Sequence, residues 1–137
     1  MKILSMVVAM AALMSVVDSQ ATQAQSDASK PEFYTQQVQP IFAAHCVRCH
    51  GDSNHRGGLS LGSRQDMLLD RRNKPVVVPG DAANSLLIRL IRHEGPSNDP
   101  MPMPSKRERL SDGDIAIVER WVLAGAIVPV TLTGGKR

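Results

Sequence analysis

Apolar positions recur at helical spacing in three segments of this 137-residue chain. The first segment, residues 31–49, places an apolar stripe on one face of a helix. The stripe consists of Tyr34, Val38, Ile41, Phe42 and His45. Pro40 lies within the segment, so it either kinks the helix or starts the helix's second half. The pattern predicts a long N-terminal helix with an irregularity at Pro40.

Two further segments show the same periodicity. Residues 84–92 and 111–124 carry apolar stripes formed by Leu86, Leu87, Leu90 and Ile91, and by Ile115, Val118 and Val122 flanked by Ile117 and Trp121. Ser111 is the expected N-cap of the last helix, and Gly125 is its expected stop. Residues 76–78 are expected to form a short extended segment between turn-rich stretches. The chain is therefore predicted to be all-α, with about three helices joined by long loops.

The N-terminus has the pattern of a secretory signal peptide. Lys2 is followed by an apolar stretch over residues 3–17 and then by small residues that resemble cleavage sites. We assign residues 1–24 to the signal peptide and expect the mature protein in the periplasm. The apolar stretch is shorter than the roughly 20 residues that a membrane span needs, although an uncleaved N-terminal anchor remains an alternative.

The rest of the chain is long enough for one small domain. Residues 25–32 are polar and are expected to form a disordered linker, residues 33–130 form the domain, and residues 131–137 form a C-terminal tail. The chain has only one Trp, one Tyr and two Phe, so we expect a small apolar core. A buried prosthetic group would supply the missing apolar volume. The net charge of +3 is spread along the chain.

The densest basic run lies at residues 106–109. It is interpreted as a solvated loop, with a docking patch for an acidic redox partner as the alternative. Nucleic-acid binding is not expected, because aromatic residues do not alternate with the basic ones.

Residues 46–50 read Cys-Val-Arg-Cys-His and contain both cysteines of the chain. This run is the attachment signature of a c-type haem. On a helix, Cys46, Cys49 and His50 share one face, so both thiols can reach haem vinyl groups while the imidazole reaches the iron. The alternatives are a thioredoxin-like redox pair, a zinc site or a disulfide, and the first two need surroundings that this sequence does not show.

The second axial position of the iron needs a ligand from the downstream sequence, unless it stays open for chemistry. Met101 and Met103 alternate with prolines that would hold a thioether in place, and Met101 is slightly preferred. The competing interpretation is that these methionines only pack in the loop. His93 and, less readily, His55 are rival ligands. Methionine ligation would raise the reduction potential and favour simple electron transfer.

Several stretches in order resemble a planctomycete-type cytochrome c domain, a relative of the class I cytochromes c. They are Val38-x-Pro40-Ile41-Phe42, Cys46 to Gly51, Gly57 to Leu61, Val78 to Asp81, Ser85 to Leu87, Met101-Pro102, and Leu110 through Trp121 to Ala126. The resemblance covers about residues 33–126. It implies one covalent haem c, a proximal His50, a distal Met from the Met-Pro stretch and haem attachment outside the cytoplasm. The family usually shows a single Met-Pro-Pro, whereas this chain has Met-Pro twice, so the resemblance does not choose between Met101 and Met103.

The function expected from these features is that of a monohaem c-type cytochrome rather than an enzyme. It would carry single electrons between a protein donor and a protein acceptor, as a soluble carrier or as a small subunit of a membrane redox complex. The alternative is a small haem peroxidase or a gas-responsive haem sensor, with an open or labile sixth ligand. The sequence leaves the oligomeric state undetermined.

Overall fold

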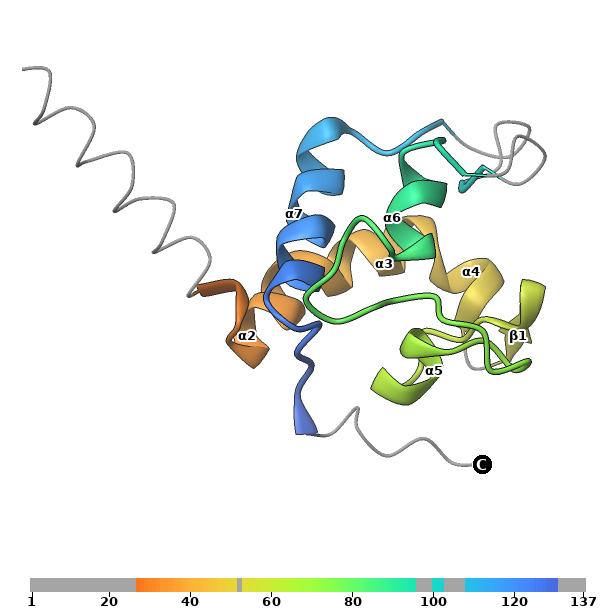
Figure 1. Ribbon diagram of the computed structural model, residues 1–137, viewed down its shortest axis with the longest axis horizontal. Helices are drawn as coiled ribbons and strands as arrows, with labels where there is room; N and C mark the ends of the chain where they lie inside the picture. Colours follow the sequence, from red (N-terminus) through yellow and green to blue (C-terminus); the bar gives the residue numbers. More distant parts are fainter. Residues whose placement is uncertain (1–26, 52, 96–99, 103–107, 131–137) are drawn as a thin grey trace, which may run out of the picture.

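The computed structural model describes residues 27–51, 53–95, 100–102 and 108–130. This part of the chain is mostly helical, with loops between the helices (Figure 1). The helical elements are α2 (Pro31–Phe33), the π-helical η1 (Tyr34–Val38), α3 (Gln39–His45), α4 (Val47–His50), the 3-10 turn η2 (Arg56–Gly58), α5 (Arg64–Leu68), α6 (Leu86–Ile91) and α7 (Asp112–Leu123). The short β1 (Asn54–His55) follows α4. The predicted all-α class is confirmed.

The long N-terminal helix that we predicted is divided into short consecutive pieces. Pro40 lies in the first turn of α3, where a helix does not need the N–H that proline lacks. The turn before it is widened, and the N–H of Gln39 donates to the carbonyl oxygen of Tyr34 five residues earlier. Cys46 then departs from helical backbone angles between α3 and α4. Of the two outcomes expected for Pro40, it starts the second half.

Helix α5 has no counterpart among the helices expected from the sequence. Ser63 caps it, because its hydroxyl accepts a hydrogen bond from the N–H of Asp66 at 3.2 Å. The hydroxyl also donates to the Asp66 carboxylate at 2.8 Å. Met67 is buried in the core, as expected of a packing methionine. The Ser-x-x-Asp spacing was the local signal that could have predicted this helix.

The last helix begins and ends where the sequence predicts. The Ser111 hydroxyl accepts a hydrogen bond from the N–H of Asp114 at 3.1 Å. Gly125 follows the helix with a φ of 104°, a conformation that glycine adopts without strain. Residues 76–78 do not form a strand; an isolated bridge pairs Leu69 with Pro75 instead.

The core lies where the N-terminal pieces meet α7. Tyr34, Phe42 and Trp121 form an aromatic trio whose ring centroids lie 5.6 to 6.3 Å apart. The indole N–H of Trp121 donates to the carbonyl oxygen of Ile127 at 2.7 Å, so this polar group is satisfied inside the core. Burial raises the pKa of Tyr34 to about 12. The three rings therefore stabilise the same contact, the one between the N-terminal helical pieces and α7.

The residues that the structure describes begin inside the segment that we assigned to the linker. Ala28 is buried, and Lys30 forms an ion pair with Asp27 just before α2. The predicted signal peptide, residues 1–24, and the tail, residues 131–137, lie outside the described residues. In the described part, no helix is both long enough and apolar enough to cross a membrane.

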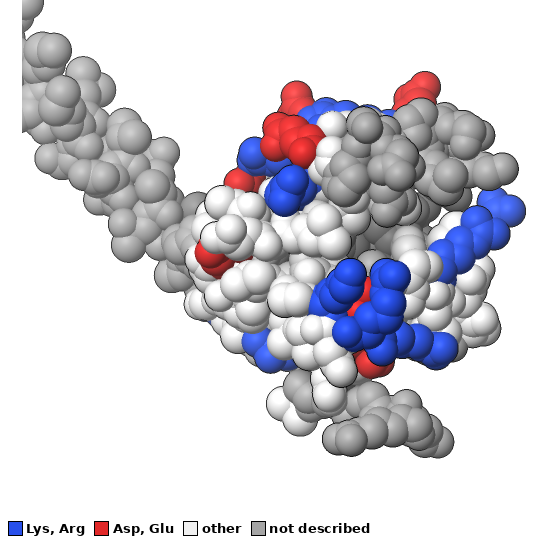
Figure 2. All heavy atoms as spheres, turned by 45° about the vertical axis from the view of Figure 1, so that its right-hand side comes forward, with Lys and Arg blue, Asp and Glu red and all other residues white. Residues whose placement is uncertain are grey.

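Lys and Arg side chains gather on the face that Figure 2 brings forward. The exposed residues Arg56, Arg71, Arg72 and Lys74 come from two loop segments. Main-chain contacts join the segments: the N–H of Arg71 donates to the carbonyl oxygen of Gly58 at 3.0 Å. We call these four residues the basic patch. It is distinct from the basic run at residues 106–109, of which residues 106 and 107 lie outside the described residues.

Candidate functional site

Cys46, Cys49 and His50 lie on one helical turn. The carbonyl oxygen of Cys46 accepts hydrogen bonds from the N–H groups of both Cys49 and His50, each at 3.0 Å. All three residues are half-buried. Residues at positions i, i+3 and i+4 of a helical turn project from one side, so the turn brings the two thiols and the imidazole together, as the spacing predicts.

Gly51 ends this turn in a position that excludes a side chain. A Cβ atom at Gly51 would lie 2.6 Å from the carbonyl oxygen of Val47. The chain then folds back, with bridges that pair Gly51 with Asn54 and His50 with His55. The N–H of Leu61 donates to the carbonyl oxygen of His50 at 2.8 Å. The backbone of His50 is therefore held by its own turn and by the returning loop.

The residues at this turn fit a covalently attached haem. No disulfide joins Cys46 to Cys49, and both cysteines are only half-buried. Cys46 packs against the core, as do the half-buried apolar residues Leu59 and Leu68. Two thiols and an imidazole on one turn are the donor set that haem vinyl groups and iron require. Within the described ranges, no group of three or more His, Cys, Asp and Glu residues is arranged to hold a metal ion.

Met101, the preferred distal ligand, lies at the C-terminal end of α6. Its N–H donates to the carbonyl oxygen of Leu90 at 3.1 Å, and the residue is half-buried. The same carbonyl accepts the N–H of His93 at 3.1 Å. Met103 lies outside the described residues, so the choice between the two methionines stays a prediction.

A comparison with known protein families identifies the segment that carries these residues. The family model described as Planctomycete cytochrome C matches residues 46–105. Residues 46–105 are therefore similar to a planctomycete-type cytochrome c domain. The match begins at Cys46 and extends past Met103, so it spans the CxxCH turn and both candidate methionines. No curated protein and no solved structure matches the chain.

Similarity to this family has a chemical implication. A cytochrome c domain implies haem c and electron transfer through it. It is typically an electron carrier rather than an enzyme. The individual roles of Cys46, Cys49, His50, Met101 and Met103 remain predictions from their positions.

His93 is the rival ligand closest to Met101 in the cytochrome c domain. Its φ is 61°, a left-handed backbone conformation that is uncommon outside glycine. Its Nε2 atom is buried and has no hydrogen-bond partner among the described residues. His55 and His45 each bury Nδ1 in the same way. A buried ring nitrogen without a partner carries a desolvation cost, so His93 retains its place as a candidate ligand.

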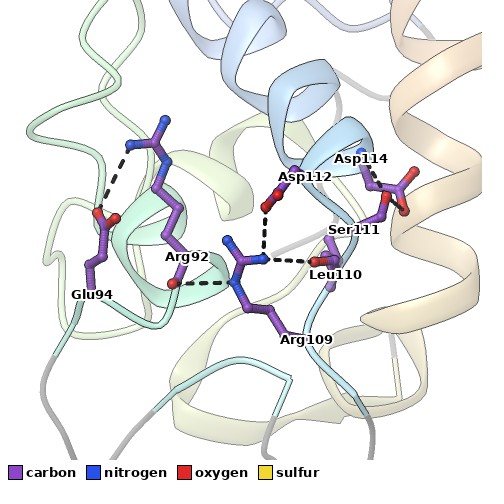
Figure 3. Close-up of polar contacts among 7 residues, drawn as sticks. All are labelled: Arg92, Glu94, Arg109, Leu110, Ser111, Asp112 and Asp114. Atoms are coloured by element: carbon purple, nitrogen blue, oxygen red, sulfur yellow. Dashed lines mark hydrogen bonds and ion pairs between the residues drawn. The ribbon is translucent and has the colours of Figure 1, made fainter.

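A polar network joins the two ends of the segment that contains the methionines (Figure 3). Arg109 Nε donates to the carbonyl oxygen of Arg92 at 3.4 Å, and Arg109 Nη1 donates to the carboxylate of Asp112 at 2.8 Å. Arg92 in turn pairs with Glu119 on α7 and lies 3.9 Å from Glu94. Sequence reasoning missed this network, because its partners are far apart in the chain and show no local motif.

Proposed function

We propose that this protein is a monohaem c-type cytochrome that carries single electrons in the periplasm. It acts between a protein donor and a protein acceptor, either as a soluble carrier or as a small subunit of a membrane redox complex. The observation that supports this most directly is the shared helical turn of Cys46, Cys49 and His50 within the segment that matches the family.

Each residue of the site has a distinct task in this proposal. Cys46 and Cys49 would hold the group through thioether bonds. His50 would bind the iron through its imidazole, and its main-chain hydrogen bonds hold the backbone that carries this side chain. Met101 or Met103 would provide a thioether sulfur as the second ligand. When bound, a haem c supplies a one-electron iron couple, whose potential the axial ligands and burial adjust.

An absorption spectrum of the purified protein tests the proposal. The chain is produced in cells that have the haem-attachment machinery, and spectra are recorded in both redox states. We expect a low-spin, six-coordinate spectrum with a far-red iron–thioether band in the oxidised state. Replacing Cys46 and Cys49 by Ser should make the haem extractable by acidified organic solvent. Retention of covalent haem in that variant, or a complete lack of haem in the parent protein, overturns the proposal.

The same sample separates the carrier from the alternative enzyme or sensor. A six-coordinate carrier should bind added carbon monoxide slowly and should react slowly with hydrogen peroxide. Rapid binding of carbon monoxide together with a five-coordinate spectrum would contradict the carrier and favour a haem peroxidase or gas sensor.

A further inference from the structure

The basic patch has a composition and a location that the haem site alone does not explain. It contains four exposed positive residues, Arg56, Arg71, Arg72 and Lys74. Arg72 Nη2 forms an ion pair with the Asp70 carboxylate at 3.1 Å. The remaining excess of three positive charges is as large as the net charge of +3 for the whole chain. These four residues therefore create a local excess of positive charge on this surface.

Asp70 organises this surface from beneath. Its side chain is buried, and its Oδ1 atom accepts hydrogen bonds from the main-chain N–H groups of Arg72 at 2.8 Å and Lys74 at 2.9 Å. These hydrogen bonds, led by the one from Lys74, and the pairing with Arg72 lower the pKa of Asp70. The hydrogen bonds and the ion pair of the Asp70 carboxylate therefore lie within the turn. The guanidinium of Arg71 and the ammonium of Lys74 face solvent.

Exposed apolar residues border these charges. The backbone of Leu69 pairs with that of Pro75 at the base of the turn that carries Arg71, Arg72 and Lys74. Leu69 is 39 % exposed and Pro75 is also exposed. Protein–protein interfaces combine exposed apolar side chains with charged and polar residues around them, and Leu69 beside the basic residues offers both. A lipid headgroup or a free anion would need the charges but not the exposed leucine.

The basic patch is connected directly to the candidate haem-attachment turn. Arg72 Nη2 donates to the carbonyl oxygen of Gly57 at 3.4 Å, which ties the patch to the loop that returns from α4. That loop contains His55, whose backbone pairs with His50. A partner bound at the patch would therefore lie beside the turn that carries the CxxCH residues.

We propose that the basic patch and Leu69 form the docking surface for an acidic protein partner with an apolar side chain at the centre of its own surface. This inference rests on the proposed electron-carrier function, since it gives that function a place where electrons are exchanged. The positive charges steer the partner to the surface, and Leu69 provides the contact that excludes water.

Binding to defined polymers tests the docking surface without knowledge of the natural partner. The probes are fluorescent polyglutamate, a fluorescent random copolymer of glutamate and tyrosine, and vesicles that contain phosphatidylglycerol. Fluorescence anisotropy reports polymer binding to the haem-loaded protein at low ionic strength, and cosedimentation reports vesicle binding. We expect the copolymer to bind more tightly than polyglutamate, because its tyrosines can contact Leu69. Equal binding of the two polymers would contradict the apolar part of the surface.

Three variants separate charge from apolar contact. Arg71→Glu with Lys74→Glu should weaken binding of both polymers about ten-fold, the lower end of what a charged surface contributes to association. Leu69→Ser should weaken copolymer binding roughly three-fold and leave polyglutamate binding unchanged. Lys30→Glu with Arg89→Glu makes the same change in net charge away from the patch and is the matched control. The proposal fails if this control loses as much affinity as the patch variant, or if Leu69→Ser leaves copolymer binding unchanged.

Vesicle binding distinguishes a protein partner from a membrane surface. Vesicle binding that exceeds copolymer binding and disappears in the patch variant would assign the surface to a membrane and overturn the protein-docking proposal. Haem attachment is measured separately, from covalent retention of the haem in the same preparations. Weak polymer binding with covalent haem present therefore refutes the docking surface alone, whereas missing haem refutes the proposed function alone.

Discussion

Arg109 and Arg92 are linked by a hydrogen bond from Nε of Arg109 to the main-chain oxygen of Arg92 at 3.4 Å. The two residues lie 17 positions apart, on either side of the segment that contains Met101 and Met103. The bond joins the residue that follows α6 to the residues just before α7, so it holds the two ends of that segment together. A methionine in the loop is therefore positioned by contacts outside the Met-Pro sequence itself.

Arg109→Met should weaken this closure and leave the rest of the fold intact. The variant keeps a long side chain but loses its hydrogen bonds to Arg92, Leu110 and Asp112. Because Arg109 is exposed, we expect a loss of only about 0.5–1 kcal/mol in the free energy of unfolding. The far-red iron–thioether band should disappear on heating before the helices unfold, as followed by circular dichroism. Arg89→Met, on the exposed side of α6, is the control, and simultaneous loss of both signals in the Arg109 variant would contradict this prediction.

The preferred distal ligand can be identified by single substitutions. Met101→Ala should abolish the far-red band and lower the reduction potential, because a thioether ligand stabilises ferrous haem. Met103→Ala should retain the band. Spectroelectrochemistry of both variants measures the two properties together. The reverse pattern would assign the ligand to Met103, and retention of the band in both variants would exclude both methionines.

Gly51→Ala should disturb the turn that presents His50. The added Cβ would lie 2.6 Å from the carbonyl oxygen of Val47, a backbone atom that cannot move aside without altering α4. Overpacking of this kind costs about 1–3 kcal/mol. We expect a lower unfolding midpoint in urea and a smaller yield of covalent haem. Gly113→Ala, in the first turn of α7, is the matched control and should be neutral or slightly stabilising, because its Cβ would make only an ordinary contact, 3.7 Å from Ser111 Oγ. Equal behaviour of the two variants would contradict the role of Gly51.

Stability should fall at alkaline pH because of Tyr34. Its pKa is about 12 in the folded protein and close to 10.0 when the side chain is exposed. The unfolded state therefore ionises first, and the stabilising contribution, present below pH 10, is lost as the pH rises toward 12. This difference corresponds to about 2–3 kcal/mol at pH 12. Urea unfolding of the parent protein and of Tyr34→Phe, at pH 8 and at pH 11, measures it. The parent should lose more stability than the variant, and parallel losses would show that Tyr34 does not titrate in this way.

The elements predicted correctly from the sequence are those with strong local signals. The helix that Ser111 caps and Gly125 stops has its apolar stripe where the periodicity places it, and Trp121 is buried. The turn at Cys46 to His50 is likewise helical, as its spacing requires. These features depend on contacts between residues three or four positions apart, which the sequence displays directly.

Other features depend on contacts between residues distant in the chain. The interruption at Pro40 was foreseen, but the π-helical turn before it, in which the N–H of Gln39 donates to the carbonyl oxygen of Tyr34, was not. The pairing of Arg109 with Arg92, and of Arg72 with the loop at Gly57, follows from tertiary packing and leaves no periodic pattern. Charge counted along the sequence therefore drew attention to residues 106–109 and overlooked the basic patch.

The aromatic trio gives the protein an optical reporter of its own. Trp121 is the single tryptophan of the chain and is fully buried at the crossing of α7 and the N-terminal pieces. Its fluorescence reports whether this crossing is intact. The visible absorption of an attached haem would report on the turn at Cys46 and on the segment between α6 and α7. Tryptophan fluorescence and haem absorption thus distinguish a change at the iron ligands from unfolding of the helical core, in one unlabelled sample.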